Sequence, residues 1–564
     1  MTPKPLSFFT PESVFVDKAG MDGLLLTLRR DLRNDFYAPS PTNLAHEYIS
    51  SDLAVAAETA AATTQNFDRQ VVPTGTGSSD FFRSWTQAFQ AIKNANIVIS
   101  RIDIPDWDAD NDKNEVLAEG FFHRAYWYYR LVHQFGDVPF INKEHVAPKM
   151  DFYTHSRKTI LAKIQADMEF AVQWLPEIVE PGKVNRAAGL HLLTKICLAN
   201  SAFVQAIDAA SAVINNGRYK LMTQRFGIVA GDSRFNVIWD LHQKENKSLS
   251  NNTEAILVVQ DKYGFPGSTN GTQTLRQYTP WWSNNTYLKD PDGRRACIDT
   301  RGNWQVLAFG RGVGQLRPSN YYQYTIWKDI SDLRHDTDTN WMPVSKIRYN
   351  NPASKYYGQV LDIRYSNPQD TFRAYYGWPH YKLYVSDERV PDQPIGGNAD
   401  WYVFRLAETY LLRAEAYHWV GENQKAAEDI NKVRQRAKAS PVSPSEISIA
   451  YILDERAREL YAEEPRKTEL TRISFIMADN NRNGYAIGNF STKNFWYDRV
   501  LATNFYNTGL QWGLNEYKMS PFHVLWPVPQ NAIDSNTGGR INQNAGYPGT
   551  EKNVLPLTEI TDQQ

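Results

Sequence analysis

The chain of 564 residues carries 61 Lys and Arg against 62 Asp and Glu, which gives a formal net charge of -1, and it holds two cysteines. This balance, without a basic block, argues against a nucleic-acid partner. Cys197 and Cys297 lie too far apart for a short-spaced metal or redox motif. No window approaches the roughly 18 consecutive apolar residues of a membrane-spanning helix. The length allows several ordinary domains or one large one.

Residues 81–220 have the apolar spacing of successive helices. Apolar side chains recur every three or four positions in five segments: 81–102, 114–135, 157–175, 186–200 and 204–215. The second segment ends before Gly136 and Pro139, which stop a helix. Because a helix pair cannot cover its own apolar stripe, neighbouring pairs must stack. We therefore predict a spine of helix pairs.

The same pattern returns in the C-terminal part of the chain. Helices are predicted for 403–419, for 424–439 after a stop at Gly421, and for a third segment after Glu446. The tetrapeptide Ser443-Pro-Ser-Glu446 has the form of a capping box with proline at the first helical position. Because the spacing is not a strict repeat of about 34 residues, we interpret these helices as tetratricopeptide-like.

Residues 221–400 lose the helical period and become rich in Gly, Asn, Pro and aromatic residues, apart from a strand-like run at 255–259. A second irregular segment covers 480–515. Long loops in compact proteins usually carry function, so we place the ligand site in the insert. The predicted fold class is mainly α, with tetratricopeptide-like helix pairs forming a spine that bears a large irregular, loop-rich insert. Its parts are an N-terminal segment with an irregular start and then a helix (1–80), N-terminal helix pairs (81–220), the aromatic-rich, ligand-binding insert (221–400), C-terminal helices (401–475) and an irregular segment that completes a single unit (476–564).

Aromatic residues gather in the insert and indicate what it binds. Flat aromatic rings match the C–H face of a sugar, while amide and guanidinium groups match its hydroxyl rim. The loop 276–287 (RQYTPWWSNNTY) supplies both kinds of group, and two adjacent tryptophans are hard to bury on the same side. The predicted ligand-binding residues of the insert are Tyr278, Trp281, Trp282, Asn284, Tyr287, Trp304 and Tyr322. The alternative for each ring is packing in the core of an irregular subdomain. We expect Trp281→Ala or Trp282→Ala to weaken binding by about tenfold or more without unfolding the chain.

Seven motifs, taken in order along the chain, carry a family resemblance. They are 88–96 (AFQAIKNAN), 118–126 (AEGFFHRAY), 135–139 (FGDVP), 405–416 (RLAETYLLRAEA), 455–460 (ERAREL), 526–529 (WPVP) and 541–547 (INQNAGY). In order and spacing they resemble the SusD/RagB family. The chain departs from the family pattern twice: Glu463-Glu464-Pro465-Arg466 stands where the family usually has Glu-Gly-x-Arg, and Asn544-Ala545-Gly546-Tyr547 where it has Asn-Pro-Gly-Tyr.

The resemblance implies a SusD-like fold and a function. Family members are glycan-binding outer-membrane lipoproteins on the surface of Gram-negative Bacteroidetes, each paired with a SusC-like TonB-dependent transporter. This implies that the protein captures an oligosaccharide or polysaccharide for nutrient uptake, does no chemistry on it and needs no cofactor. The resemblance also adds Trp85 to the ligand-binding residues, because family ligand sites draw on a loop near the first helix pair as well as on the insert.

The N-terminus carries a further expectation from the resemblance. The first residues, Met1-Thr-Pro-Lys-Pro5, have no apolar signal core. Mature family members begin with a lipid-carrying cysteine, a short polar lead and a Phe- and Leu-rich segment, much like residues 6–26 of this chain. We expect that Met1 replaces a removed signal peptide and anchor cysteine, so that only the missing N-terminal lipid would touch the membrane.

Two charged segments have structural interpretations. Residues 106–112 (DWDADND) place carboxylates at alternate positions of a calcium-loop pattern but lack its glycine at position six and its glutamate at position twelve. We interpret them as carboxylates gathered before a helix N-terminus, where the helix dipole favours them, with bound calcium as the alternative. Residues 329–338 (DISDLRHDTD) look like a recurrent Asp-x-Arg segment of the family, which implies charge-assisted bonds that hold loops together.

Enzyme motifs are missing from the sequence: it has no His-Glu-x-x-His pair, no Gly-x-Ser-x-Gly elbow and no phosphate-binding loop. Two alternatives stay open. A glycoside hydrolase needs only two carboxylates about 5 or 6.5–9.5 Å apart, which a sequence cannot exclude. A peptide-binding helical-repeat scaffold, or a partner in peptide import, would use the concave face of the helix pairs, but those helices carry aromatics such as 126–129.

Overall fold

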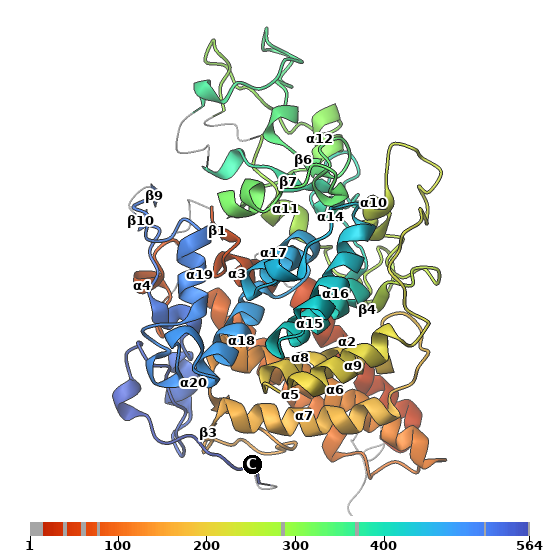
Figure 1. Ribbon diagram of the computed structural model, residues 1–564, viewed down its shortest axis with the longest axis vertical. Coiled ribbons are helices and arrows are strands. Elements are labelled where there is room, and N and C mark those ends of the chain that lie inside the picture. The colour runs from red at the N-terminus through yellow and green to blue at the C-terminus, as the bar shows by residue number, and fades with distance from the viewer. Residues whose placement is uncertain are drawn as a thin grey trace, which may run out of the picture.

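A computed structural model describes residues 15–37, 42–57, 64–75, 79–283, 288–366, 372–512 and 515–561. It is mainly helical, as predicted, and the strands within these ranges form five two-stranded pairs. In Figure 1 the long helices fill the lower and middle parts of the molecule, and the insert rises above them as short helices and loops. The predicted combination of a helical spine and a loop-rich insert is therefore confirmed.

The N-terminal helices stack in chain order. Their bounds are α2 Lys18–Tyr37, α5 Ser79–Ser100, α6 Asp110–Phe135, α7 Arg157–Trp174, α8 Arg186–Ala199 and α9 Phe203–Ile214. Each of α5 to α8 packs against the next helix along the chain. The predicted helices agree with these bounds within a few residues. Ser156 and Asn185 supply side-chain N-caps to α7 and α8.

Four C-terminal helices continue the spine. They are α15 Leu406–Trp419, α16 Asn423–Arg436, α17 Ile449–Leu460 and α18 Arg466–Asp479. α15 packs against α9 and so joins the two halves, while α18 packs against α6. Residues far apart in the sequence therefore share one core.

One predicted helix start is wrong, whereas the capping box at 443–446 and the helix predicted after it are both present. The segment 403–419 begins as strand β8 (Trp401–Arg405), whose backbone pairs with β4 (Ala255–Val259), so α15 starts only at Leu406. The capping box of Ser443 and Glu446 encloses a single 3₁₀ turn, η6 (Pro444–Glu446). The helix itself, α17, starts after Ser448, whose side chain accepts a hydrogen bond from the Tyr451 amide.

The insert is built of short elements, and its predicted strand at 255–259 is confirmed as β4. The others are α10 Val237–His242, α11 Thr274–Tyr278, α12 Trp304–Phe309, β5 Leu316–Pro318, the π-helical turn η2 Tyr321–Thr325, η3 Leu333–His335, β6 Trp341–Met342, η4 Val344–Lys346, η5 Ile363–Tyr365, β7 Trp378–Pro379 and α14 His380–Leu383. β5 pairs with β1 and β6 with β7. Figure 1 places α11, α12, β6 and β7 at the base of the upper lobe.

Further short elements lie around the spine. They are α3 Asn43–Ile49, β1 Ala54–Ala56, α4 Phe67–Gln70, β2 Val138–Pro139, β3 Thr154–His155, η7 Arg482–Gly484, η8 Ile487–Asn489, α19 Phe495–Thr503, β9 Gln511–Trp512, β10 Asn515–Glu516, η9 Pro521–Val524, α20 Gln530–Ser535 and η10 Thr550–Lys552.

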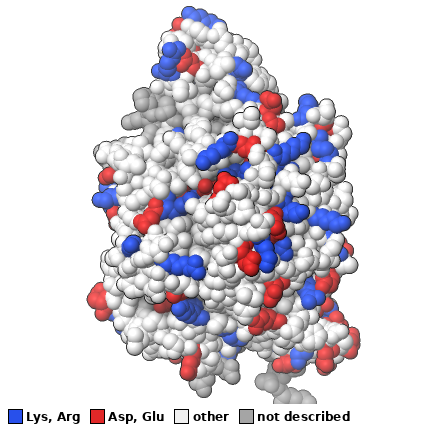
Figure 2. Space-filling view, viewed as in Figure 1, with Lys and Arg blue, Asp and Glu red and all other residues white. Residues whose placement is uncertain are grey.

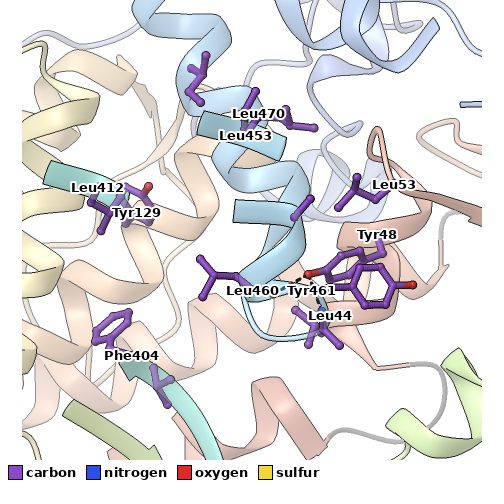
Figure 3. Packing of buried hydrophobic residues seen from close by; sticks show 14 of the residues in the cluster. Leu44, Tyr48, Leu53, Tyr129, Phe404, Leu412, Leu453, Leu460, Tyr461 and Leu470 are labelled. Carbon is purple, nitrogen blue, oxygen red and sulfur yellow. Dashed lines mark hydrogen bonds between the residues drawn. The ribbon is translucent and has the colours of Figure 1, made fainter. Parts of the chain in front are cut away.

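The core joins the N-terminal segment to the C-terminal helices. Figure 3 shows the side chains of α3 and the following turn close to those of α17 and α18; it labels Leu44, Tyr48, Leu53, Leu453, Leu460, Tyr461 and Leu470. The Tyr48 hydroxyl donates to the Leu460 carbonyl oxygen at 3.2 Å and accepts from the Ala462 amide at 2.7 Å. This tyrosine therefore satisfies backbone groups at the end of α17, where Ala462 has a positive φ of 62°.

Charged residues of the family motifs are buried together near α17. The Arg405 guanidinium donates to Glu463 at 2.5 Å and to Glu254 at 2.9 Å. The Arg334 guanidinium donates to Asp332 at 2.7 Å, to Glu455 at 2.8 Å and to Glu459 at 2.9 Å. The expectation for the segment 329–338 is confirmed, since Arg334 ties this loop of the insert to α17 by charge-assisted bonds.

The C-terminal motifs close the end of α6. The Asn544 amide donates to the Phe135 carbonyl at 2.9 Å and to the Trp526 carbonyl at 2.8 Å. Gly546 has a φ of +97°, and a Cβ there would lie 2.4 Å from the Phe522 side chain. The motifs at 135–139, 526–529 and 541–547 therefore contact one another, because the Asn544 side chain of the third bonds to a backbone carbonyl in each of the other two.

Charge on the surface is mixed. In the view of Figure 2, Lys and Arg alternate with Asp and Glu, with no broad area of one sign on the face shown. Asp110 and Asp112 lie in the first turn of α6, as expected for carboxylates near a helix N-terminus. Within the described ranges, no group of three or more His, Cys, Asp or Glu side chains is placed to hold a metal ion. Among the same residues, no helix is both long and apolar enough to span a membrane.

Candidate functional site

Three of the predicted ligand-binding aromatics are enclosed by the core. Trp282 is fully buried and its indole N–H donates to the Gly310 carbonyl at 3.1 Å. Tyr322 stacks on Tyr461 with ring centroids 4.1 Å apart, and Tyr278 meets the same Tyr461 edge to face at 5.8 Å. We therefore correct the expectation that Tyr278, Trp282 and Tyr322 face a ligand: neighbouring rings and backbone cover them.

Trp85 lies in a different part of the molecule. It is almost fully buried on α5 and packs edge to face on Phe135, with centroids 5.2 Å apart. Its edge lines an apolar pocket of about 340 Å³ whose other walls come from 89–152 and 532–541. No residue of the insert lines this pocket among those the structure describes, so Trp85 and the insert aromatics do not share it.

The other predicted residues have different positions. The Trp304 side chain is 44% exposed at the first position of α12. Trp281 is half-buried next to the buried Trp282, so the adjacent tryptophans do split as the sequence suggested. Asn284 and Tyr287 lie outside the described residues. Trp281 and Trp304 are thus the described candidates of the insert that keep exposed surface.

Backbone pairing fixes the position of Trp281. The Trp281 amide donates to the Arg373 carbonyl at 3.1 Å, and the Gly314 amide donates to the Thr279 carbonyl at 3.0 Å. The Arg373 side chain donates through Nε to the Val313 carbonyl at 2.8 Å. The segments around Trp281, Gly314 and Arg373 therefore contact one another, and the Arg373 guanidinium carbon lies 4.2 Å from the centre of the Trp281 ring.

A second arginine lies on the neighbouring strand β5. The guanidinium carbon of Arg317, in β5, is 4.8 Å from the Phe372 ring centre and 4.9 Å from that of Phe505. Among the described residues Arg317 has no ion-pair partner, and its guanidinium donates a hydrogen bond to the Asn320 side chain at 3.4 Å. Burial lowers the pKa of the Arg317 guanidinium below its ordinary value. Close by, in η2, Tyr324 is 62% exposed.

We call the group formed by Trp281, Arg317, Tyr324, Phe372 and Phe505 the arginine–aromatic surface. It offers aromatic rings for apolar stacking and the Arg317 guanidinium, whose N–H groups have no carboxylate partner among the described residues. Sequence reasoning missed Arg317, Phe372 and Phe505. Phe505 does lie in the second irregular segment, 480–515, but nothing in the sequence shows that this segment meets β5 in space.

The fold and this surface define a class of protein: a tetratricopeptide-like helical spine that carries an irregular insert with an aromatic, arginine-bearing face. Comparison with known families gives the class its name. Residues 237–547 match the model described as the SusD family, and residues 38–198 match a model described as starch-binding associating with outer membrane. The chain belongs to the SusD family.

Individual relatives are distant but cover most of the chain. The Starch-binding protein SusD of Bacteroides thetaiotaomicron is 25% identical over 470 residues, which cover 76% of this chain and 72% of that protein. SusD-like protein P2 of Formosa agariphila is 24% identical over 406 residues, with 68% of each chain covered. The recognition made from motifs is thus confirmed.

Solved structures share the fold. A laminarin binding SusD-like protein superposes with a TM-score of 0.64 at 19% identity, covering 94% of this chain and 100% of that one. Surface glycan-binding protein A from Bacteroides fluxus gives a TM-score of 0.65, also at 19% identity, with the same coverage. At such identities the likeness shows the architecture alone.

Proposed function

We propose that this protein captures glycans at the cell surface and delivers them to a partner TonB-dependent outer-membrane transporter. Family membership supports the proposal. So do the names of its relatives, one of which is a starch-binding protein, one a laminarin binding protein and one a surface glycan-binding protein. In this proposal the protein is a lipoprotein held in the outer membrane by an N-terminal lipid, and it performs no chemistry on its ligand.

The arginine–aromatic surface is the observation that carries the proposal. A sugar ring presents a face of C–H groups, which aromatic rings such as those of Trp281 and Tyr324 match at low entropic cost. It also presents hydroxyl groups that accept hydrogen bonds, and the Arg317 guanidinium has N–H donors without a carboxylate partner in the described structure.

Binding to a short oligosaccharide should be weak. The surface is open to solvent at Tyr324, so a ligand there recovers little desolvation energy. We expect dissociation constants in the micromolar to millimolar range, or roughly -4 to -8 kcal/mol. A transporter that encloses the ligand would retain it by mass action, because ligand that prefers the closed state shifts the equilibrium toward closure.

Native affinity electrophoresis tests the proposal. The protein is run through gels that contain plant, microbial or host polysaccharides, next to Tyr153→Ala, a change at an exposed tyrosine outside the arginine–aromatic surface. We expect one glycan class to retard both proteins while the polymer keeps its length. Shortening of the polymer would contradict the non-enzymatic part of the proposal. If no polysaccharide retards the protein, and titration detects no binding of the corresponding oligosaccharides, glycan capture is overturned.

A further inference from the structure

A second pocket of suitable size lies away from the arginine–aromatic surface. It has a volume of about 590 Å³, within the range of roughly 300–1,000 Å³ that is usual for small-molecule sites. Its walls come from Arg33 on α2, from the loop 260–268 that follows β4, and from residues 388–400 that precede β8. The residues that line it include none of the arginine–aromatic surface.

The loop at the mouth of this pocket presents two aromatic rings to solvent. Tyr263 is 49% exposed and Phe265 is 57% exposed. Gly264 and Gly267 have φ values of +78° and +80°, so the loop takes turns that favour glycine and hold the two rings outward. Neighbouring aromatic rings on a polar surface mark a binding site more often than single exposed apolar residues do.

The base of the pocket is built rigidly. The buried Asp261 carboxylate accepts hydrogen bonds from the Thr269 backbone amide at 2.8 Å and from the Thr269 hydroxyl at 2.5 Å. It accepts a third from the side-chain amide of Asn398 at 2.7 Å. The Asp261 backbone amide donates to Asp400 at 3.2 Å. These bonds tie the two ends of the aromatic loop to the segment before β8, so a ligand would not have to order the base of the pocket.

Polar groups with spare hydrogen-bonding capacity stand around the rings. Nη1 of Arg33 lies 3.5 Å from the Gln260 carbonyl oxygen and 4.0 Å from the Asp261 carboxylate, both longer than a normal N–H···O bond. The exposed side-chain amide of Gln260 makes no hydrogen bond to the described residues. Lys244 and Glu388 form an ion pair at the rim.

The charges of the lining do not favour an ionic ligand. Three cations (Arg33, Lys244 and Lys262) stand among four carboxylates (Glu245, Asp261, Glu388 and Asp400). With neither sign dominant, a charged ligand would meet a like charge wherever it met an opposite one. Aromatic faces, an amide and a weakly paired guanidinium match instead the C–H face and hydroxyl rim of an uncharged sugar.

We propose that this pocket, with Tyr263 and Phe265 as stacking platforms and Arg33 and Gln260 as hydrogen-bonding groups, is a second glycan subsite. It takes neutral sugar units of the same polymer that binds the arginine–aromatic surface, so the inference rests on the proposed function. Two sites on one rigid chain raise the affinity for a polymer that spans both, because the second contact becomes intramolecular.

The test compares three proteins in the same gels and titrations: wild type, Tyr263→Ala/Phe265→Ala, and Tyr357→Ala. Tyr357 is a matched control, because it is 49% exposed, as Tyr263 is, and lies outside this pocket. The probes are the polysaccharide that retards the wild type and a short oligosaccharide of it. We expect the double variant to bind the polymer at least about tenfold more weakly and to bind one oligosaccharide per chain where the wild type binds two.

The outcomes separate the two proposals. A wild-type protein that binds no glycan overturns the proposed function and this inference together. A wild-type protein that binds one oligosaccharide, with a double variant of unchanged polymer affinity, overturns the second subsite and leaves the proposed function in place. An equal loss in Tyr357→Ala would also overturn it, because the effect would then follow from losing any exposed ring.

Discussion

Arg466 forms a bidentate ion pair with Asp52, which lies 414 positions earlier in the sequence. The Nε and Nη2 atoms of Arg466 each donate a hydrogen bond of 2.8 Å to a different oxygen of the Asp52 carboxylate. Both side chains are fully buried. Arg499 adds a third bond to Asp52 at 3.0 Å. Burial alone would raise the pKa of Asp52, but these arginines hold it below its ordinary value. The end of the family motif at 463–466 therefore anchors the N-terminal segment.

Removal of Arg466 should destabilise the protein strongly. In Arg466→Ala the buried Asp52 carboxylate loses its bidentate partner and, among the described residues, keeps one arginine, Arg499. Breaking one side of a buried ion pair typically costs about 3–5 kcal/mol. We expect the urea midpoint of unfolding to fall accordingly. Arg234→Ala is the control, because Arg234 forms an exposed pair with Asp232. Equal midpoints for the two variants would show that the buried pair contributes nothing special.

Acid should weaken the protein through Glu455. Burial raises the pKa of Glu455, but Arg334, Arg458 and Arg434 outweigh it and lower the pKa from 4.5 to about 2. A carboxyl with a depressed pKa in the folded state contributes stability that is present above the unfolded value and lost as pH falls. The stability that Glu455 contributes, about 3 kcal/mol at neutral pH, is therefore lost as pH falls from about 4.5 to about 2.

Urea unfolding at a series of pH values measures this effect. Glu455→Gln should be less stable than wild type at pH 7, since it leaves three arginines short of a carboxylate. The gap should shrink as pH falls below 4.5. A gap that stays constant down to pH 2 would contradict the assignment of acid sensitivity to Glu455.

Lys467 destabilises the folded protein at pH 7, whereas Glu455 stabilises it, although stability rises with pH in both windows. Burial lowers its pKa from 10.5 to about 7, only partly offset by Glu47, and its Nζ donates to the Val524 carbonyl at 2.5 Å. Between pH 7 and 10.5 the unfolded chain binds the extra proton, so stability rises with pH across this window. Lys467→Met should be more stable than wild type at pH 7, by roughly 2–4 kcal/mol, and should lack the rise. Parallel stability curves for the two proteins between pH 7 and 10 would refute this.

Gly546 should tolerate no side chain. Its φ of +97° disfavours any L-residue, and a Cβ there would meet the Phe522 side chain at 2.4 Å. Gly546→Ala should therefore lose about 2–4 kcal/mol by strain and clash together. Gly488→Ala is the matched control, because nothing lies within 4 Å of its Cβ position and its φ is not positive. Thermal unfolding of both variants measures the difference; equal melting temperatures would contradict the steric argument.

The helical spine could be predicted from sequence because its signals are local. The apolar spacing that predicted each helix lies within the segment that forms it. The start of α15 could not be predicted, since it depends on the pairing of β8 with β4, about 150 positions earlier in the chain. The buried ion pair of Arg466 and Asp52 could not be predicted either, because charges this far apart in sequence give no periodic pattern.

The site was only partly accessible for a related reason. The pair Trp281 and Trp282 predicted that the two rings diverge, because adjacent side chains of an extended segment point to opposite sides. Which ring turns outward depends on what covers each side, and that is decided by Gly310 and Arg373. Likewise Arg317, Phe372 and Phe505 come from three separate segments that only the folded chain brings together.

The two adjacent tryptophans now yield a discriminating test. Trp282→Ala should unfold the chain at lower urea, by about 3–5 kcal/mol, because the ring is fully buried and its N–H bonds to Gly310. Trp281→Ala removes a half-buried ring whose centre lies 4.2 Å from the Arg373 guanidinium carbon, so the urea midpoint should change little. Under the proposed function, Trp281→Ala should weaken glycan binding by about tenfold or more, whereas Trp281→Tyr should keep most of it by preserving a flat face.

Two measurements separate loss of contact from loss of fold. Isothermal titration uses the oligosaccharide of whichever polymer retards the wild type, and urea unfolding is measured for each variant. If Trp281→Ala keeps full affinity while folded, Trp281 is no part of the ligand site, and the site would have to rest on the other members of the arginine–aromatic surface.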